Sequence, residues 1–466
     1  MNAPLTLQLG CFIAKLRHSD LPQDVASRIA VAFTDTAGVM VAGAVDPASR
    51  LLRTILAPAG GEATLLSDGA RASAMDAAWI NGTAAHALDY DDSARRGGHV
   101  SAVLVPAILA EAQAIGASGK QMLVAYAAGY ETLSELIWRD PGQHHEKGWH
   151  PTGVFGAVAA AAACASLRGL DAEQSAMAIA IGASQSAGLI ANVGTMTKPL
   201  HAGKAAHTGV VSARLAQAGF TAAADAFEHA PGFLTAFSPG SAIDVTTAVR
   251  AGEVWRLCGE NPLNVKQYPL CYYTQRTIDG TLDLMQANPV RAADIERITV
   301  NISPRNATIL RYALPQTGLE AKFSVQFAAV CSIIAGRPGL AELTDEFVGR
   351  DDVQMLMKRV SVIRDERDDP QLPGYAIFDQ TVVELRDGRR VEGPRVNKVR
   401  GGSDLPLTRD ALRAKFDDCM RHGGGEASDE LFDMLMSLER LDRIDRLVAA
   451  LVPAHGFHTH QQAGKK

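Results

Sequence analysis

Apolar side chains recur at helical spacing through most of the first half of the chain. Between residues 21 and 41, Val25, Ile29, Phe33 and Met40 fall on one face of a helix. The same spacing predicts further helices over 73–87, 101–115, 120–136, 153–167 and 171–181. Several of these segments are rich in alanine and apolar on every side, so we expect them at the centre of a large helical domain.

The pattern changes after about residue 260. Residues 294–302 alternate apolar and polar positions, which is typical of a half-buried strand, and 360–364 is a second candidate strand. Residues 378–391 predict a hairpin that turns at Asp387-Gly388. Further helices are expected over 323–335, 409–419, 428–438 and 441–451.

This order of elements predicts a mainly α protein with two domains. Residues 1–262 and 400–466 would form one large all-helical domain. Residues 263–399 would form a smaller α+β domain, inserted before the C-terminal helices.

Composition narrows the class of partner. The formal net charge of −6 argues against nucleic acid or an anionic membrane as the main partner. Six scattered cysteines without a CxxC pair indicate reduced thiols in a cytoplasmic protein. The most apolar run, 153–167, is shorter than the roughly 20 residues that span a bilayer, so no membrane segment is expected.

The first chemically distinctive stretch runs from His86 to Asp92 and continues to His99. It holds three carboxylates and two histidines directly after a predicted helix. His86 and Asp89 are three residues apart and could share a helix face. The residue types would suit a metal, but no HExxH or comparable ligand spacing is present. A solvated acidic helix end is the alternative interpretation.

The second stretch is GWHPTG, residues 148–153, directly before an alanine-rich helix. His150 would sit at a helix N-terminus, where free N–H groups and the dipole favour an anion. That position also lowers the pKa of a histidine, which suits a neutral base. A histidine in a structural turn is equally compatible with this segment.

Two more stretches carry lysines. Residues 194–207 hold Lys198, His201 and Lys204 among glycines and threonines. A lysine before a proline, as in Lys198-Pro199, is expected in extended backbone, where it could pair with substrate carboxylates or transfer a proton. A solvated basic loop is the alternative. Lys266 lies where the predicted elements change from helices alone to helices and strands, although such a lysine is more often on the surface.

Taken together, these stretches resemble the MmgE/PrpD family. The resemblance covers nearly the whole chain and is carried by NGTAAHALDYDD, GWHPTGVFG, GTMTKPLHAGKAA and EAKFSVQF, in that order. It implies a helical domain with a smaller α+β lid domain, a homodimer, and no metal or organic cofactor. The family includes 2-methylcitrate dehydratase, cis-aconitate decarboxylase and iminodisuccinate epimerase.

The resemblance also implies site residues. The catalytic candidates are His150, His99, Lys198, Lys266 and Asp91. The candidates for substrate binding are Asp92, His86, Thr152, Thr197, His201, Lys204 and Tyr268. Two positions depart from the family pattern: Val100 replaces the usual proline after His99, and Phe327 replaces a tyrosine that could exchange a proton.

The shared chemistry is proton transfer at a carbon next to a carboxylate. A histidine would act as the base, and lysines would stabilise the negative charge that develops. The leading hypothesis is a cofactor-free lyase that dehydrates a small hydroxylated di- or tricarboxylate. The alternatives are an epimerase of a dicarboxylate, a decarboxylase of the cis-aconitate type, and a non-catalytic binding protein on the same scaffold.

Overall fold

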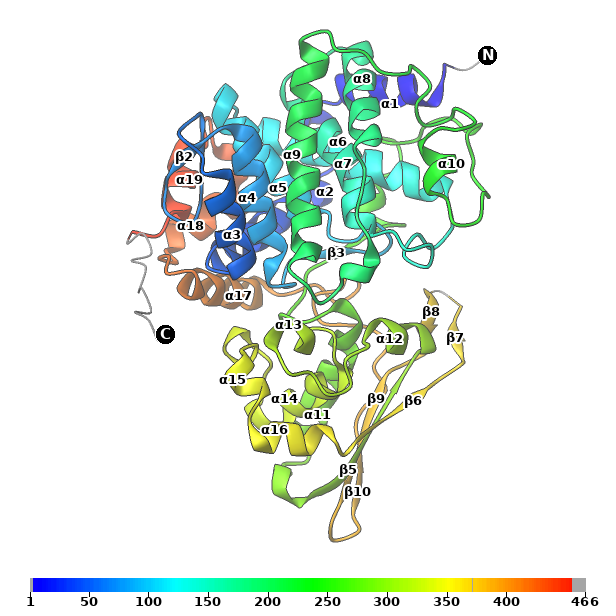
Figure 1. Ribbon diagram of the computed structural model, residues 1–466, viewed down its shortest axis with the longest axis vertical. Helices are drawn as coiled ribbons and strands as arrows, with labels where there is room; N and C mark the ends of the chain where they lie inside the picture. The colour runs from blue at the N-terminus through cyan, green and yellow to red at the C-terminus, as the bar shows by residue number, and fades with distance from the viewer. Residues whose placement is uncertain (1–2, 371, 455–466) are drawn as a thin grey trace. The chain divides into compact units, whose positions relative to one another are not determined.

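The chain folds into two compact units, as the computed structural model shows for residues 3–370 and 372–454 (Figure 1). The first unit comprises Met1–Leu263 with Thr408–Lys466, and the second comprises Asn264–Leu407. Helices dominate the described residues and the strands are short. The predicted mainly α class is therefore confirmed.

The first unit is built almost entirely of helices. Its strands are two residues long: β1 (Ala63–Thr64), β2 (Arg71–Ala72) and β3 (Ser93–Ala94). Its α-helices are α1 (Leu5–Lys15), α2 (Gln23–Gly43), α3 (Pro47–Leu56), α4 (Ala74–Ala87), α5 (Ser101–Ile115), α6 (Gly119–Arg139), α7 (Pro151–Leu167), α8 (Ala172–Ser184), α9 (Thr197–Gln217), α10 (Phe233–Phe237), α17 (Arg409–His422), α18 (Asp429–Met436) and α19 (Asp445–Leu451).

Small side chains let the central helices approach closely. Helix α7 is fully buried over most of its length, and alanine is also the residue with the highest helix propensity. A Cβ added at Gly209 of α9 would lie 2.2 Å from the Cβ of Ala160, and one at Gly203 would lie 2.3 Å from the carbonyl oxygen of Trp79 in α4. Helix α9 therefore packs tightly between α4 and α7, as Figure 1 shows in green, blue and cyan.

Helix α9 was not predicted, and it includes the stretch that carries Lys198. Lys198 was expected in extended backbone before Pro199, and that expectation was wrong, because both residues lie in the first turn of α9. The N–H groups of a first turn have no acceptor inside the helix, so a proline there costs no hydrogen bond. Lys198 is thus fixed to a rigid element rather than to a loop.

The second unit holds a four-stranded sheet in the order β10-β9-β5-β6. Strands β5 and β6 are parallel, and the other neighbours are antiparallel. Helix α11 packs on β9 and α14. The elements are α11 (Gln275–Ala287), β5 (Ile295–Ile302), α12 (Pro304–Ile309), α13 (Gly318–Ala321), α14 (Val325–Ala335), α15 (Asp345–Val348), α16 (Asp351–Met357), β6 (Val360–Arg364), β7 (Asp368–Asp369), β8 (Leu372–Ala376), β9 (Gln380–Leu385) and β10 (Arg390–Glu392). In the sequence, the boundary between the units falls within β4 (Leu263–Asn264).

Among the described helices, α2 alone is long and apolar enough to cross a bilayer by length and composition. Its most apolar window is 78% buried inside the protein, where α4 and α17 pack against it. Core helices of globular proteins have the same properties, so α2 is weak evidence for a membrane segment.

Candidate active site

Four helix ends of the first unit meet around a cluster of histidines. Helix α4 ends one residue after His86, and α5, α7 and α9 begin close to His99, His150 and Lys198. The backbone N–H of His99 donates to Oγ1 of Thr152 over 3.0 Å, which joins the start of α5 to the start of α7. Three helix N-termini therefore face the cluster, and their dipoles favour negative charge there.

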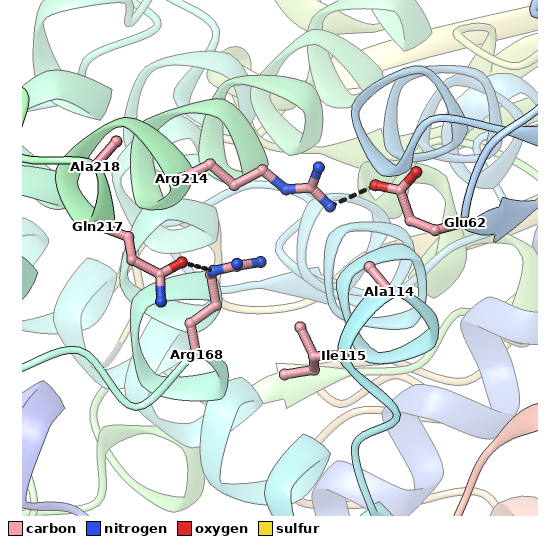
Figure 2. Close-up of a pocket in the computed structure, with 7 residues that line it drawn as sticks. All are labelled: Glu62, Ala114, Ile115, Arg168, Arg214, Gln217 and Ala218. Carbon is pink, nitrogen blue, oxygen red and sulfur yellow. Dashed lines mark hydrogen bonds and ion pairs between the residues drawn. The ribbon is translucent and has the colours of Figure 1, made fainter.

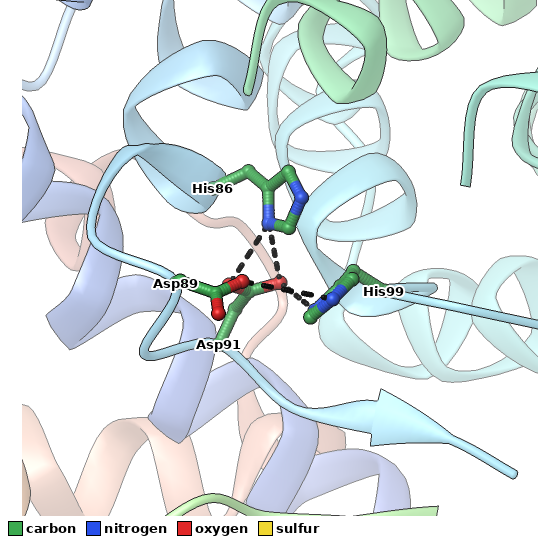
Figure 3. Close-up of side chains that lie close together, drawn as sticks. All are labelled: His86, Asp89, Asp91 and His99. Carbon is green, nitrogen blue, oxygen red and sulfur yellow. Dashed lines mark hydrogen bonds and ion pairs between the residues drawn. The ribbon is translucent and has the colours of Figure 1, made fainter. Parts of the chain in front are cut away.

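Asp91 is the centre of the cluster (Figure 3). Nδ1 of His86 lies 3.0 Å from both carboxylate oxygens of Asp91, and Nδ1 of His99 lies 2.9 Å from Oδ2. Burial alone would raise the pKa of Asp91, but the two imidazoles hold that pKa well below its ordinary value. An ionised carboxylate only accepts hydrogen bonds, so both histidines carry their proton on Nδ1.

Lys198 contacts the second ring nitrogen of His86. Its Nζ lies 2.9 Å from Nε2 of His86 and 2.6 Å from Oδ1 of Asp89. Burial, followed by the charge of Lys198, lowers the pKa of His86 to about 3 despite the opposing effect of Asp91. His86 is therefore a neutral imidazole that donates to Asp91 and accepts from the ammonium group.

The sequence suggested that Asp89 and His86 could share a helix face, but in the structure they do not. Helix α4 ends at Ala87, and Asp89 adopts a left-handed backbone conformation with φ of 53°. That conformation is unfavourable for a residue with a Cβ, although aspartate tolerates it better than most. It directs the carboxylate to Lys198, a contact that the sequence did not reveal.

His99 presents its second ring nitrogen to the same space. Its Nδ1 is held by Asp91 and by the backbone carbonyl of Asp92 at 3.0 Å, while Nε2 lies 3.7 Å from Oδ1 of Asp89. The preceding Gly98 has φ of 72°, and a Cβ there would lie 2.5 Å from Oγ1 of Thr152. Only glycine fits at this turn, which sets the position of His99.

His150 and His201 form a second pair next to His86. Their Nδ1 atoms are 3.1 Å apart, and the ring of His150 stacks on that of His86 at a centroid distance of 5.9 Å. Burial, and then the charge of Lys198, hold the pKa of His150 well below its ordinary value. The expected neutral state of His150 thus has burial as its first cause. At the N-cap of α7, His150 also occupies the predicted helix start.

Ligand atoms of His86, Asp89, Asp91 and His99 lie within 4.8 Å of one another, close enough to hold a metal ion. The donor set does not fit a metal, however. Both ring nitrogens of His86 already have partners, and the Lys198 ammonium lies against Asp89, where a second cation would be repelled. The arrangement suits proton transfer between neighbouring groups.

The other predicted residues lie in different surroundings. Asp92 is buried, and burial followed by the nearby Asp35 raises its pKa well above the ordinary value, which favours a neutral acid. Lys204 lies about 240° around α9 from Lys198, with its Nζ 4.6 Å from the ring of Trp79. The backbone N–H of Thr197, at the start of α9, donates to Oγ1 of Thr195.

Lys266 and Tyr268 belong to the second unit. Lys266 is fully buried, and the Tyr268 hydroxyl donates to Asp279 over 3.0 Å. Tyr268 lines a pocket of about 530 Å³ in that unit, together with Arg400. Phe327 lies in the core of the same unit and packs edge-on against Phe347, so its ring is a packing element.

A different pocket, of about 540 Å³, lies at the opposite ends of the same three helices of the first unit (Figure 2). It is lined by the C-terminal residues of α5 and α9 and by Arg168, the C-cap of α7. Arg168 and Arg214 both bind the fully buried Glu111. These arginines offset the negative helix ends and a buried carboxylate, which is a structural role.

Two family domains match this chain. The MmgE/PrpD N-terminal domain matches residues 7–246, and the MmgE/PrpD C-terminal domain matches residues 268–438. The chain belongs to the MmgE/PrpD family. The N-terminal domain match includes all of the histidines, carboxylates and lysine of the cluster.

Enzymes are found among its relatives. The chain is 28% identical over 351 residues to the cis-aconitate decarboxylase of Mus musculus, which covers 73% of this chain and 70% of the relative. It is equally similar to that of Homo sapiens, over 73% of this chain and 71% of the relative. It is 27% identical to the cis-aconitate decarboxylase-like protein oryM of Aspergillus oryzae, over 96% of this chain and 94% of the relative.

Proposed function

We propose that this chain is a lyase that removes CO2 from a small unsaturated polycarboxylate of the cis-aconitate type. The convergence of three helix N-termini on Lys198 and the histidine cluster carries the proposal. A polycarboxylate needs positive potential where it binds, which the helix N-termini and Lys198 would supply once His99 is protonated. The names of the relatives favour loss of CO2 over loss of water, which the sequence alone had placed first.

The reaction requires the protein to stabilise a carbanion and to supply a proton to carbon. When the bond between carbon and a carboxylate breaks, CO2 leaves, the bonding electrons form a new C=C bond, and the electron pair of the old double bond moves to the carbon next to a second carboxylate. The resulting carbanion is conjugated with a second carboxylate and must be stabilised as negative charge spreads onto that group. A proton then adds to carbon, and the product is a carboxylic acid with one carboxylate fewer. Cations and hydrogen-bond donors in a buried site stabilise such an intermediate most effectively.

We assign the acid to His99 and the stabilising cation to Lys198. Protonated on both nitrogens, His99 would be stabilised by Asp91 at Nδ1 and could give the proton on Nε2 to carbon. His150 is better suited to hydrogen bonding as a neutral ring, because its surroundings oppose a second proton. Lys266 remains a predicted second cation.

The net charge of the cluster supports the assignment of the acid to His99. With neutral histidines, Lys198 is outnumbered by the two carboxylates of Asp89 and Asp91, so the cluster carries one excess negative charge. A polyanionic substrate would be repelled by that charge. A proton on His99 removes it, so substrate binding and protonation of the acid favour each other.

Loss of water from a hydroxylated tricarboxylate is the second candidate, because the same acid could protonate a leaving hydroxide. We further propose a cytoplasmic homodimer. The cytoplasmic location is supported by six free cysteines, and the dimer by the family resemblance alone.

The decisive experiment is incubation of cis-aconitate, citrate and 2-methylcitrate with the enzyme in D2O, followed by NMR. We expect cis-aconitate to lose CO2 and to gain one deuterium at the carbon that is protonated. An alkene formed from a hydroxylated acid would replace the decarboxylase by a dehydratase. Deuterium exchange with no group lost would indicate an epimerase, and binding without turnover would reject an enzyme.

A further inference from the structure

A buried lysine from a helix that follows the second unit in the sequence contacts the backbone of the cluster. Lys415 comes from α17, after the second unit, and its side chain is 2% exposed. Its Nζ lies 2.5 Å from Oδ1 of Asp35 in α2 and donates to the backbone carbonyl of Tyr90 over 2.7 Å. It also lies 4.1 Å from the centroid of the Tyr90 ring.

Packing of α17 on α2 does not require this cation. Four apolar side chains of α17 are already buried: Leu412, Phe416, Cys419 and Met420. Phe416 contacts Gly38 of α2, where a Cβ would lie 2.9 Å from its ring. A buried ion pair is often replaceable by apolar residues without loss of stability, so its presence calls for another reason.

Tyr90 is the residue between the two carboxylates that organise the cluster. Asp89 pairs with Lys198 from a left-handed backbone conformation, and Asp91 holds His86 and His99. Such a backbone conformation persists only where neighbouring contacts impose it. The Tyr90 carbonyl, which accepts a hydrogen bond from Lys415, lies one residue from each of these aspartates in the sequence.

We propose that the Asp35–Lys415 ion pair is a positioning element for the cluster. By fixing the Tyr90 carbonyl and ring, it sets the backbone from Asp89 to Asp92. The Asp89 carboxylate then meets Lys198, and the Asp91 carboxylate meets both imidazoles. On this proposal Lys415 acts through the Tyr90 backbone and not on the substrate. The inference rests on the proposed function for its effect on turnover, while its effect on His86 and His99 is independent of any substrate.

The test compares three proteins labelled with ¹⁵N in their histidines. Lys415→Met keeps the volume of the side chain and removes the charge. The double variant Asp35→Asn with Lys415→Met removes both charges, so no unpaired charge stays buried if the single variant fails to fold. Arg139→Met is the matched control, because it breaks a buried ion pair with Glu135 elsewhere in the first unit.

Imidazole nitrogen shifts report which ring nitrogen carries the proton. In the wild-type protein, we expect both His86 and His99 to be protonated on Nδ1. In folded Lys415→Met or the double variant, we expect a mixture of tautomers for at least one of them. We also expect kcat to fall about 10- to 100-fold with KM changed little, since misplacement of a reacting group affects the chemical step. Arg139→Met should lower the Tm without either change.

The outcomes separate the two proposals. Unchanged tautomers in a folded Lys415→Met or double variant would overturn the positioning role, whatever the substrate. Changed tautomers in Arg139→Met as well would show that the effect is general destabilisation, and would also overturn it. Wild-type protein that turns over no polycarboxylate would reject the proposed function but leave the tautomer comparison intact.

Discussion

At the scale of single residues, the histidines of the cluster differ in the partners of their ring nitrogens. Both nitrogens of His86 have close partners, His150 is buried as a neutral ring, and Nε2 of His99 lies 3.7 Å from Oδ1 of Asp89. Three identical side chains therefore have three different surroundings. The difference comes from burial, together with one carboxylate, Asp91, and one ammonium group, Lys198.

Removing either of two groups should abolish most of the activity. We expect His150→Ala and Lys198→Ala each to lower kcat by about 10²- to 10³-fold, the usual cost of removing one group that stabilises developing negative charge. Steady-state kinetics with the substrate identified by the D2O experiment would measure this loss, and circular dichroism would verify that each variant is folded. Lys120→Ala, at an exposed position of α6, serves as the control. Normal turnover by a folded His150→Ala protein would refute its assignment.

The low pKa of His86 makes stability depend on pH. In the unfolded chain a histidine titrates near 6.5, and in the folded protein His86 titrates near 3. The unfolded state therefore binds more protons between these values, and stability falls as the pH is lowered from 6.5 towards 3. At pH 5 the loss from His86 alone is about 2 kcal/mol relative to neutral pH.

Chemical denaturation at pH 7 and pH 5 would measure this loss. His86→Gln should lose less stability over the same interval, by about 2 kcal/mol, because glutamine does not titrate. An equal pH dependence in both proteins would mean that His86 is not held neutral in the fold.

At the scale of elements, the position of Lys198 depends on how closely α9 packs against α4. A Cβ at Gly203 would lie 2.3 Å from the Trp79 carbonyl, so Gly203→Ala must push the helices apart. We expect a loss of about 1–3 kcal/mol in stability, typical of overpacking, together with a lower kcat. Gly240→Ala is the control, because nothing lies within 4 Å of that position. Thermal unfolding and kinetics of both variants decide the matter; equal behaviour would contradict the packing argument.

Helices with a regular apolar pattern were predictable to within a few residues. The bounds of α5 and β6 agree with the sequence pattern, and α8 begins one residue after the predicted start at Asp171, which forms a capping box with Gln174. Helix α9 was not predicted, because Pro199 and two glycines weaken its helical signal while tertiary packing compensates. Helices α1, α3 and α11 were also not identified.

At the scale of the whole molecule, the sequence could indicate residues of the cluster but not how they are joined. The motifs named His86, Asp91, His99 and Lys198, since each lies in a recognisable stretch. Lys415 carries no such signal, because its partner Tyr90 is 325 residues away along the chain. Contacts of this kind are made by the fold and leave no local pattern.

Ligand binding should protect segments that are distant in sequence but adjacent in the first unit. We expect tricarballylate, an unreactive tricarboxylate, to slow hydrogen exchange in 86–99, 150–155 and 197–203. The region of Arg168 and Arg214 should not respond, because its arginines are already matched by carboxylates. At 100 times the Kd, binding would add about 2.7 kcal/mol to stability. Protection confined to the arginine pocket would place the ligand there instead.

The origin of Lys415 beyond the second unit also affects how the protein is made. Ribosomes release the segments of the cluster first, then residues 264–407, and only afterwards α17. Because domains tend to fold as they emerge, the histidines are gathered while the cation that holds Tyr90 has not yet been synthesised. On this order of events, a growing chain acquires its finished site only after α17 has been synthesised, and a chain that stops before α17 lacks the last part of it.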